Sequence, residues 1–227
     1  MILVPIKNLA KAKQRLASML DQPARTELAQ VMLSNVVAAI AEFGGDEVTL
    51  ATSDAFAMEL ARRYRFEIIP DESNISETDA IEMATRSCEA RGVHSTLVIP
   101  GDIPLIEAAD LRAIYDASPK TGSVLVPSTD KRGTNAVLRR PASLFPLRFG
   151  NDSFMPHLTA AIATNKSCVV LSLPRIGLDI DTPEDLHQLA QAPGEKRSQM
   201  LARKLGFGEK GAFAAGTRDQ GSLSAKS

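Results

Sequence analysis

Short runs of aliphatic and β-branched residues alternate along this chain with longer stretches in which apolar residues return every three or four positions. The short runs predict strands, because a strand buried on both faces is apolar throughout its length. The longer stretches predict helices with one apolar face, as in residues 25–43, where Leu28, Met32 and Val36 fall on one side. The predicted strands are residues 2–6, 47–52, 66–70, 95–102, 123–128, 135–140, 168–173 and 176–181. The predicted helices are residues 25–43, 54–64, 77–90, 107–117, 153–164, 182–191 and 195–205.

Strands that alternate with helices form βαβ units, so the pattern predicts an α/β fold with a largely parallel sheet covered on both faces. The strands at 123–128 and 135–140 are joined by a tight loop, which favours antiparallel pairing there. Ser53 and Ser76 are the expected N-caps of two helices. We expect one domain over residues 1–207 and a disordered tail over residues 208–227, which are rich in Gly, Ser and charge.

The composition of the 227 residues narrows the classes of protein. The net charge is -1, so no global charge favours nucleic acid or an anionic membrane as a partner. Cys88 and Cys168 lie far apart in no C-x-x-C pattern, which indicates free thiols and no zinc site. The three histidines are too scattered for a metal cluster. The first residues resemble neither a signal peptide nor a membrane span, and we expect a cytoplasmic protein.

Cations follow the first predicted strand, at the strand end where ligands of open α/β sheets bind. Lys7, Lys11, Lys13 and Arg15 form a cluster that could hold a polyphosphate. The glycines of a P-loop or of a dinucleotide-binding fingerprint are absent from this segment. The alternative is a solvated basic segment without a ligand.

Carboxylates follow two other predicted strands. Asp102 ends the predicted strand 95–102, after an apolar run and a glycine, where it could bind Mg²⁺ or form an ordinary turn before a proline. Asp179 and Asp181 lie two apart, so a strand would place both on one face. Asp181 could instead cap the next helix, unless Thr182 does so with Asp185. A lone charge such as Asp179 is costly to bury unless it is paired or bound to metal.

Two loops have the chemistry of anion sites. Gly133-Thr134-Asn135 is a tight loop with free amides and a hydroxyl group. Gly150 to Ser153 precedes a helix, whose N-terminal N–H groups favour a phosphate or carboxylate. The alternative is plain turn chemistry with an N-cap by Asp152 or Ser153. Cations, acids and anion loops together indicate a metal-dependent enzyme that acts on phosphates.

Five segments sharpen this interpretation: "VPIKNLAKAKQRLA", "VIPGDIPLI", "GTNAVL", "FGNDSFMPHLTAA" and "GLDIDTPEDL", in this order. Together they resemble the family of 2-phospho-L-lactate guanylyltransferases and relatives that use phosphoenolpyruvate or 3-phosphoglycerate, in biosynthesis of the deazaflavin coenzyme F-420. The resemblance covers about residues 1–190. It implies the nucleotide-diphospho-sugar transferase type of fold, with a Rossmann-like mixed sheet flanked by helices.

The resemblance also implies an activity and a site. GTP would donate GMP to the phosphate of a three-carbon acid and release pyrophosphate, with Mg²⁺ as cofactor and with no nucleic acid or membrane partner; a homodimer is left open. The residues that match the family's site are Asp102, Asp179 and Asp181 for the metal, Thr134, Gly150 and Ser153 for the phosphorylated acid, and Lys7, Lys13 and Arg15 for the GTP phosphates.

One segment departs from the family pattern. Many relatives carry a Gly-Leu-Asn type motif before the third helix, where this chain has residues 70–87. Glu77 and Asp79 could contact guanine there, or Ser76 to Asp79 could be only a capping box. The departure favours 3-phosphoglycerate among the acceptors. The alternatives to this reading are another nucleotidyltransferase of the fold, such as a molybdenum-cofactor guanylyltransferase-like enzyme, and a non-catalytic nucleotide-binding protein.

Overall fold

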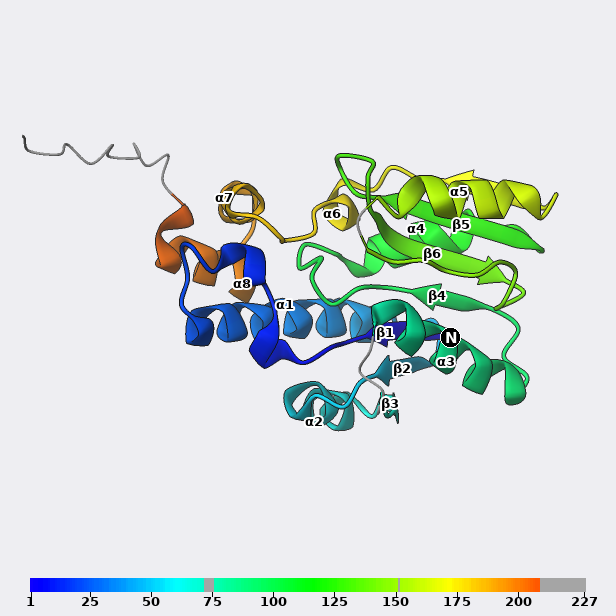
Figure 1. Ribbon diagram of the computed structural model, residues 1–227, viewed down its shortest axis with the longest axis horizontal. Helices are drawn as coiled ribbons and strands as arrows, with labels where there is room; N and C mark the ends of the chain where they lie inside the picture. Colours follow the sequence, from blue (N-terminus) through cyan, green and yellow to red (C-terminus); the bar gives the residue numbers. More distant parts are fainter. Residues whose placement is uncertain (72–75, 151, 209–227) are drawn as a thin grey trace, which may run out of the picture.

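The computed structural model describes residues 1–71, 76–150 and 152–208 and contains one seven-stranded sheet (Figure 1). Six strands run in the same direction. The exception is β6, which runs antiparallel to both strands beside it, β4 and β5. The order across the sheet is β3 (Glu67–Ile69), β2 (Val48–Ala51), β1 (Ile2–Pro5), β4 (Thr96–Val98), β6 (Thr134–Arg140), β5 (Gly122–Pro127) and β7 (Ser167–Val170). The predicted mixed, mostly parallel α/β sheet is confirmed.

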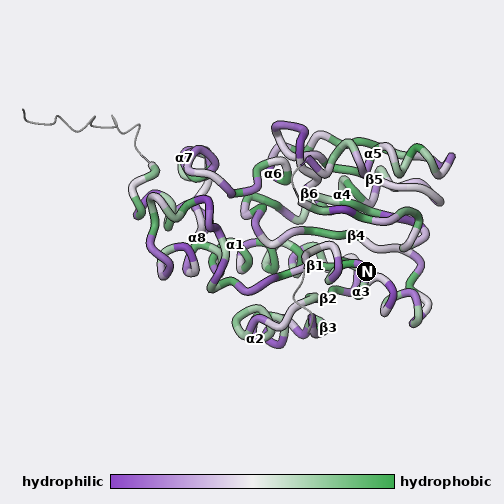
Figure 2. Tube along the Cα trace, viewed as in Figure 1, coloured by the Kyte–Doolittle hydropathy of each residue, from purple (hydrophilic) through white to green (hydrophobic). Residues whose placement is uncertain are grey.

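Helices cover both faces of this sheet. Successive strand residues alternate between two cores, as Leu3 and Val4 do, because side chains of a strand point to opposite faces. One core packs under α1, α2 and α4, and the other under α3 and α5. The bounds of these helices are α1 Gln22–Phe43, α2 Ala55–Tyr64, α3 Glu77–Ala90, α4 Ala108–Asp116 and α5 Phe154–Ala163. Figure 2 shows hydrophobic stretches along the central strands and the helices that pack on them.

A third core lies beyond the sheet, at the N-terminal half of α1. Leu28 and Met32 pack there against α7 (Pro183–Gln191) and α8 (Arg197–Ala202), which continues as a π-helical turn, Arg203–Phe207. In Figure 1, α1 extends from the sheet toward these two helices. The segment just before α7 contacts the loops that follow β1 and β4, through Asp181 with Lys13 and Ile180 with Asp102. No helix among the described residues is long and apolar enough to cross a membrane.

The prediction of a strand at 176–181 is wrong. The structure has a short helix, α6 (Pro174–Gly177), followed by an extended segment that is not part of the sheet. Leu178 and Ile180 are buried in the third core, whereas Asp179 and Asp181 face a polar site and are half-buried. The alternation therefore reflects an extended chain buried on one side, and the backbone N–H of Ile180 bonds to the carbonyl of Asp102 rather than to a strand.

Two other expectations concern helix starts. The N-cap of α2 is Asp54, which accepts from the N–H of Ala57, and the prediction of Ser53 is wrong. The Ser53 hydroxyl instead donates to the carbonyl of Asp71. Ser76 caps α3 as predicted. The expected C-terminal tail lies, apart from Gly208, outside the described residues.

Candidate active site

Two cavities open at the carboxyl ends of the central strands. The first, of about 660 Å³, is lined mainly by the segment from Pro5 to Arg15. The second, of about 820 Å³, is lined by the loops that contain Thr134 and Ser153. Both are large enough for a small-molecule ligand. They share part of their walls, and the shared residues are Arg15, Pro100, Asp102 and Asp181.

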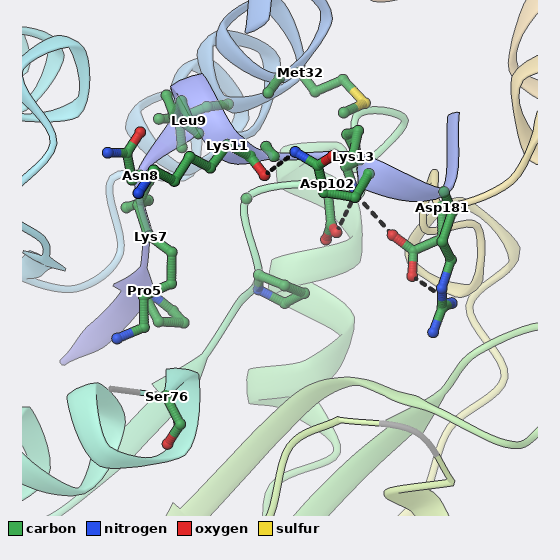
Figure 3. Close-up of a pocket in the computed structure, with 18 residues that line it drawn as sticks. Pro5, Lys7, Asn8, Leu9, Lys11, Lys13, Met32, Ser76, Asp102 and Asp181 are labelled. Carbon is green, nitrogen blue, oxygen red and sulfur yellow. Dashed lines mark hydrogen bonds and ion pairs between the residues drawn. The ribbon is translucent and has the colours of Figure 1, made fainter. Parts of the chain in front are cut away.

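Lys13 lies where the two cavities meet. Its Nζ is 2.7 Å from Asp102 Oδ2 and 2.9 Å from Asp181 Oδ1. Figure 3 draws both contacts as dashed lines. Its side chain is 8% exposed, compared with 32% for Asp102 and 39% for Asp181. Burial disfavours the ammonium form, but the two carboxylates outweigh burial and raise the pKa of Lys13 above its ordinary value. Lys13 is therefore charged, and it provides the local counter-charge of both acids.

The segment that carries Lys13 is bent and held at several points. Lys13 has a positive φ of 56° at the start of a 3₁₀ turn, Gln14–Leu16. Upstream, the N–H of Leu9 donates to Asp54. At the far end of the first cavity, Lys7 Nζ lies 2.6 Å from Asp71 Oδ2. The predicted basic cluster is thus divided: Lys7 pairs with Asp71, and Lys13 pairs with the acids.

Arg15 contributes a second cation at the junction. Its guanidinium lies 3.2 Å from Asp181 Oδ2, with its side chain 56% exposed. Burial opposes ionisation of Asp181, but Lys13 and Arg15 outweigh burial and keep the pKa of Asp181 below its ordinary value. Asp181 is therefore a carboxylate at neutral pH.

Asp179 has a different environment from Asp181. Burial raises the pKa of Asp179, and the negative charges of Asp102 and Asp181 act in the same direction. The side-chain amide of Asn135 opposes this by donating to Asp179 Oδ1 at 2.9 Å, and it also donates to the carbonyl of Ile176. Asn135 thus links the 133–135 loop to the acids, a role that sequence reasoning missed.

The three acids suit a hard cation in their chemistry. All donors are carboxylate oxygens, which Mg²⁺ prefers, and the charges of Asp102 and Asp181 disfavour a third negative charge on Asp179. Among the described residues, no three acidic, histidine or cysteine side chains converge closely enough to hold a metal ion as they stand. Lys13 occupies the position between Asp102 and Asp181. The donor set therefore fits Mg²⁺, with Lys13 as the group that a cation at those two acids would have to displace.

The two loops of the second cavity are joined by hydrogen bonds and an ion pair. The N–H of Thr134 donates to Ser153 Oγ at 3.0 Å, which joins the two predicted loops. Arg132 pairs with Asp152 across their rim, at 2.6 and 3.2 Å. Ser153 lies at the N-cap position of α5, but its side chain makes no capping bond to the helix. The alternative of an ordinary cap by Asp152 or Ser153 side chains is therefore not what the structure has.

His157 is a buried side chain that contacts both loops. The ring is 1% exposed; its Nε2 accepts from the N–H of Arg148 at 2.8 Å, and its Nδ1 lies 2.9 Å from Thr134 Oγ1. Burial, with a smaller contribution from the charge of Arg139, lowers the pKa of His157 to about 4. Sequence reasoning missed His157, because one histidine among scattered ones carries no pattern.

A family model described as "Guanylyl transferase CofC like" matches residues 1–220. The chain belongs to this family. The phosphoenolpyruvate guanylyltransferase of Rubrobacter xylanophilus is 35% identical over 192 residues, which are 84% of this chain and 93% of the relative. The 2-phospho-L-lactate guanylyltransferase of Methanothermobacter thermautotrophicus is 30% identical over 205 residues, 90% of each chain.

Solved structures agree on the fold of this CofC-like protein. A Desulfovibrio desulfuricans protein provisionally assigned as a nucleotide-diphospho-sugar transferase gives a TM-score of 0.73 at 17% identity, over 89% of this chain and 93% of that one. A nucleotidyl transferase from Methanothermobacter gives 0.57 at 16% identity, over 89% and 97%. These neighbours confirm the predicted nucleotide-diphospho-sugar transferase type of fold.

The predicted site residues of this family member fall in three places. Lys13, Arg15, Asp102 and Asp181 meet at the junction of the cavities, with Asp179 close by. Thr134, Gly150 and Ser153 line the second cavity. Lys7 lines the first cavity away from the junction, where it pairs with Asp71.

The two residues expected to contact guanine, Glu77 and Asp79, lie in the first turn of α3. Asp79 is exposed, its N–H donates to Ser76 Oγ, and its carboxylate accepts from the Ser76 hydroxyl. The bond from the Asp79 N–H is the N-cap bond that the capping alternative predicts, whereas the carboxylate accepts from the Ser76 hydroxyl and not from its backbone N–H. The side chain of Glu77 lies outside the described part of the chain. A contact of either residue with guanine stays a prediction.

Proposed function

We propose that this protein transfers GMP from GTP to the phosphate of a phosphorylated three-carbon acid, with release of pyrophosphate, in biosynthesis of coenzyme F-420. The observation that carries the proposal is the pair of cavities that meet at Asp102 and Asp181. Transfer between two anionic substrates needs two sites with one shared wall, where the phosphate of one can reach the phosphorus of the other. The relatives are named as guanylyltransferases of such acids.

GTP takes the first cavity and the acid takes the second. The first cavity is lined by Lys7, Lys11, Lys13 and Arg15, which can offset the charge of a triphosphate. The second has hydroxyl and backbone donors around Thr134, Gly150 and Ser153, which suit a small phosphate and carboxylate. The α-phosphate of GTP then lies near Asp102 and Asp181, where the cavities meet.

The acids Asp102, Asp179 and Asp181 would hold Mg²⁺. When bound, the metal supplies positive charge that lets two phosphate groups approach each other. Lys13 would leave the acids and turn to the phosphates of GTP, since the metal replaces it as their counter-charge. We propose Mg²⁺ dependence on the chemistry of these three carboxylates.

The chain's own residues position and neutralise the reactants. The acceptor phosphate attacks the α-phosphorus of GTP in line with the departing pyrophosphate, and the new P–O bond forms as the bond to pyrophosphate breaks. Lys13 and Arg15 offset the charge that develops on the pyrophosphate. A phosphate monoester is mostly dianionic at neutral pH, so the reaction requires neither a protein nucleophile nor a strong general base.

The first experiment incubates the purified protein with GTP, Mg²⁺ and one acid at a time: phosphoenolpyruvate, 3-phosphoglycerate or 2-phospho-L-lactate. Acid-dependent release of pyrophosphate would support the proposal and name the acceptor, and omission of Mg²⁺ should abolish it. ATP and CTP in place of GTP test the base. GTP binding without acid-dependent pyrophosphate would contradict the proposal and favour a non-catalytic nucleotide-binding protein.

A matched pair of variants tests the acids. Asp179→Asn should lower the rate of pyrophosphate release by about 100-fold or more, because loss of a metal-binding or charge-stabilising group typically costs this much. Glu184→Gln is the control, since Glu184 is an exposed carboxylate that lines the same cavity. It should keep near-normal activity. Near-normal activity of Asp179→Asn would show that the assignment of Asp179 is wrong.

A further inference from the structure

The second cavity contains two buried hydroxyl groups, and the oxygen of each already takes part in one hydrogen bond. Thr134 and Ser153 are 4% and 3% exposed and line the cavity. Ser153 Oγ accepts the N–H of Thr134 at 3.0 Å. Thr134 Oγ1 lies 2.9 Å from His157 Nδ1. If Nδ1 donates, the hydroxyl hydrogen of Thr134 is left for a ligand; if the hydroxyl donates to Nδ1, it is not.

The other ring nitrogen of His157 settles the direction of that bond. The N–H of Arg148 points at Nε2 from 2.8 Å, and a backbone N–H can only donate, so Nε2 carries a lone pair. A neutral ring then has its proton on Nδ1, which donates to Thr134 Oγ1. Burial beneath the cavity and the neighbouring Arg139 keep the ring neutral at physiological pH.

The consequence is a hydroxyl whose hydrogen is available to donate into the cavity. Thr134 Oγ1 receives the His157 proton, so its own hydrogen is left for another acceptor, and no described residue supplies one. The Ser153 hydroxyl is in the same position, because it accepts from Thr134 and donates to no described residue. Two adjacent donors of this kind match the oxygen atoms of a phosphate or a carboxylate.

We propose that His157 is a positioning residue for the acceptor acid: through Nδ1 it holds the Thr134 hydroxyl as a donor toward the acid in the second cavity. The inference rests on the proposed function, and it adds a residue that the sequence motifs did not single out. His157 does not touch the substrate. It acts on the acid only through Thr134.

His157 also joins the two loops of the cavity. Its Nε2 fixes the backbone at Arg148, two residues before Gly150, and the next N–H, that of Phe149, donates to Thr78 Oγ1 of α3 at 3.0 Å. The two ring nitrogens therefore have separate tasks. Nδ1 orients a ligand donor, and Nε2 supports the 148–150 backbone.

Two substitutions separate these tasks. In His157→Asn the amide can occupy the place of Nδ1 and donate to Thr134, but the Arg148 N–H loses its acceptor. In His157→Gln the longer side chain can place its carbonyl oxygen at Nε2, but it leaves no donor at Nδ1. We expect His157→Gln to raise the KM for the acid about five- to tenfold, the effect of one lost hydrogen bond, with the KM for GTP unchanged.

The same comparison distinguishes positioning from mere packing. His157→Asn should raise the KM for the acid less than His157→Gln does, because it keeps the donor to Thr134 although it disturbs the 148–150 loop. In a Thr134→Val background, His157→Gln should cause no further rise, because the hydroxyl that it orients is gone. Equal KM effects of the Asn and Gln variants, or full additivity with Thr134→Val, would overturn the proposal.

A measurement without substrate tests the tautomer itself. Nitrogen-15 NMR of the folded protein at neutral pH reports which ring nitrogen carries the proton, and the spectrum of His157→Gln assigns the signal. We expect the proton on Nδ1; a proton on Nε2 would overturn the proposal. Absence of acid-dependent pyrophosphate release by the wild type would remove the proposed function and this inference with it. Wild-type turnover with an unchanged acid KM in His157→Gln would overturn this inference alone.

Discussion

The ammonium group of Lys13 lies between Asp102 and Asp181, whereas Lys11, two residues earlier, is exposed. The sequence could not separate the two lysines, because both follow the same strand at similar distance. The positive φ at Lys13 turns its side chain into the junction of the cavities. The contact of Lys13 with the acids therefore goes together with a backbone turn that the sequence pattern does not show.

We predict that Lys13→Gln makes the protein more responsive to Mg²⁺. Without the ammonium group, Asp102 and Asp181 repel each other, and an added cation relieves this repulsion. Mg²⁺ should therefore raise the melting temperature of Lys13→Gln more than that of the wild type, while the rate of pyrophosphate release falls about 100-fold. Lys11→Gln is the matched control for the Mg²⁺ response, since Lys11 is exposed and it is Lys13 that pairs with the two acids. An equal Mg²⁺ response in the wild type and in Lys13→Gln would show that Lys13 does not compete with metal.

His157 predicts a pH dependence of stability. Its pKa is about 4 in the folded protein against an ordinary 6.5, so between these values the unfolded chain binds a proton that the folded protein does not. Stability should therefore fall as the pH drops from about 6.5 to about 4, by up to about 3 kcal/mol. In urea unfolding, His157→Gln should lose less stability than the wild type over this interval. The control is His94→Gln, at an exposed position, which should lose as much stability as the wild type does. If His157→Gln also lost as much, the neutral state of the buried His157 ring would not be the cause.

At the scale of elements, the start of α7 does more than begin a helix. Thr182 is its N-cap, with Pro183 in the first turn, which decides between the two caps that the sequence allowed. Asp185 completes the capping box, and its Oδ2 accepts from the N–H groups of both Thr182 and Asp181. The cap therefore holds the backbone of an acid at the junction of the cavities.

We predict that Asp185→Ala affects both stability and activity. Loss of the cap should destabilise the protein by about 1 kcal/mol. Because Asp181 also loses its backbone anchor, the kcat/KM for GTP should fall by about tenfold or more. Asp21→Ala is the control, since Asp21 caps α1 by accepting from Ala24 and does not line either cavity. Equal activity of the two variants, measured by pyrophosphate release, would show that the α7 cap has no role in the site.

The sequence predicted those parts of the site that depend on residues close together in the chain, and it missed those that depend on residues far apart in the chain. Caps and strands follow from neighbouring residues, so Ser76, Thr182 and most strands were predictable. The segment at 176–181 has strand-like alternation, but the N–H of Ile180 bonds to the loop at Asp102 and not to a strand. Periodicity does not report that partner. The roles of Asn135 and His157 depend on contacts 44 and 23 residues away along the chain, which no local pattern reveals.

At the scale of the whole molecule, the sheet brings together segments from opposite ends of the chain. β1 and β4 are adjacent and parallel, so the loops after them, with Lys13 and Asp102, meet at one edge. The third core around α1 and α7 then holds Asp181 against that edge. Two cavities with a common wall of charged residues result from this packing, and a ligand in one changes the electrostatic field in the other.

This shared wall predicts that GTP and the acid influence each other's binding, with a sign that Mg²⁺ determines. Two polyanions a few ångströms apart repel, so without metal each should weaken binding of the other; with Mg²⁺ bound at the acids, the repulsion should be removed or reversed. Calorimetric titration of the acid into protein with a non-hydrolysable GTP analogue, with and without Mg²⁺, measures this effect. Reciprocity requires the same factor when the order of addition is exchanged, which serves as the internal control. If the acid's Kd were independent of the analogue under both conditions, the two ligands would not meet at Asp102 and Asp181.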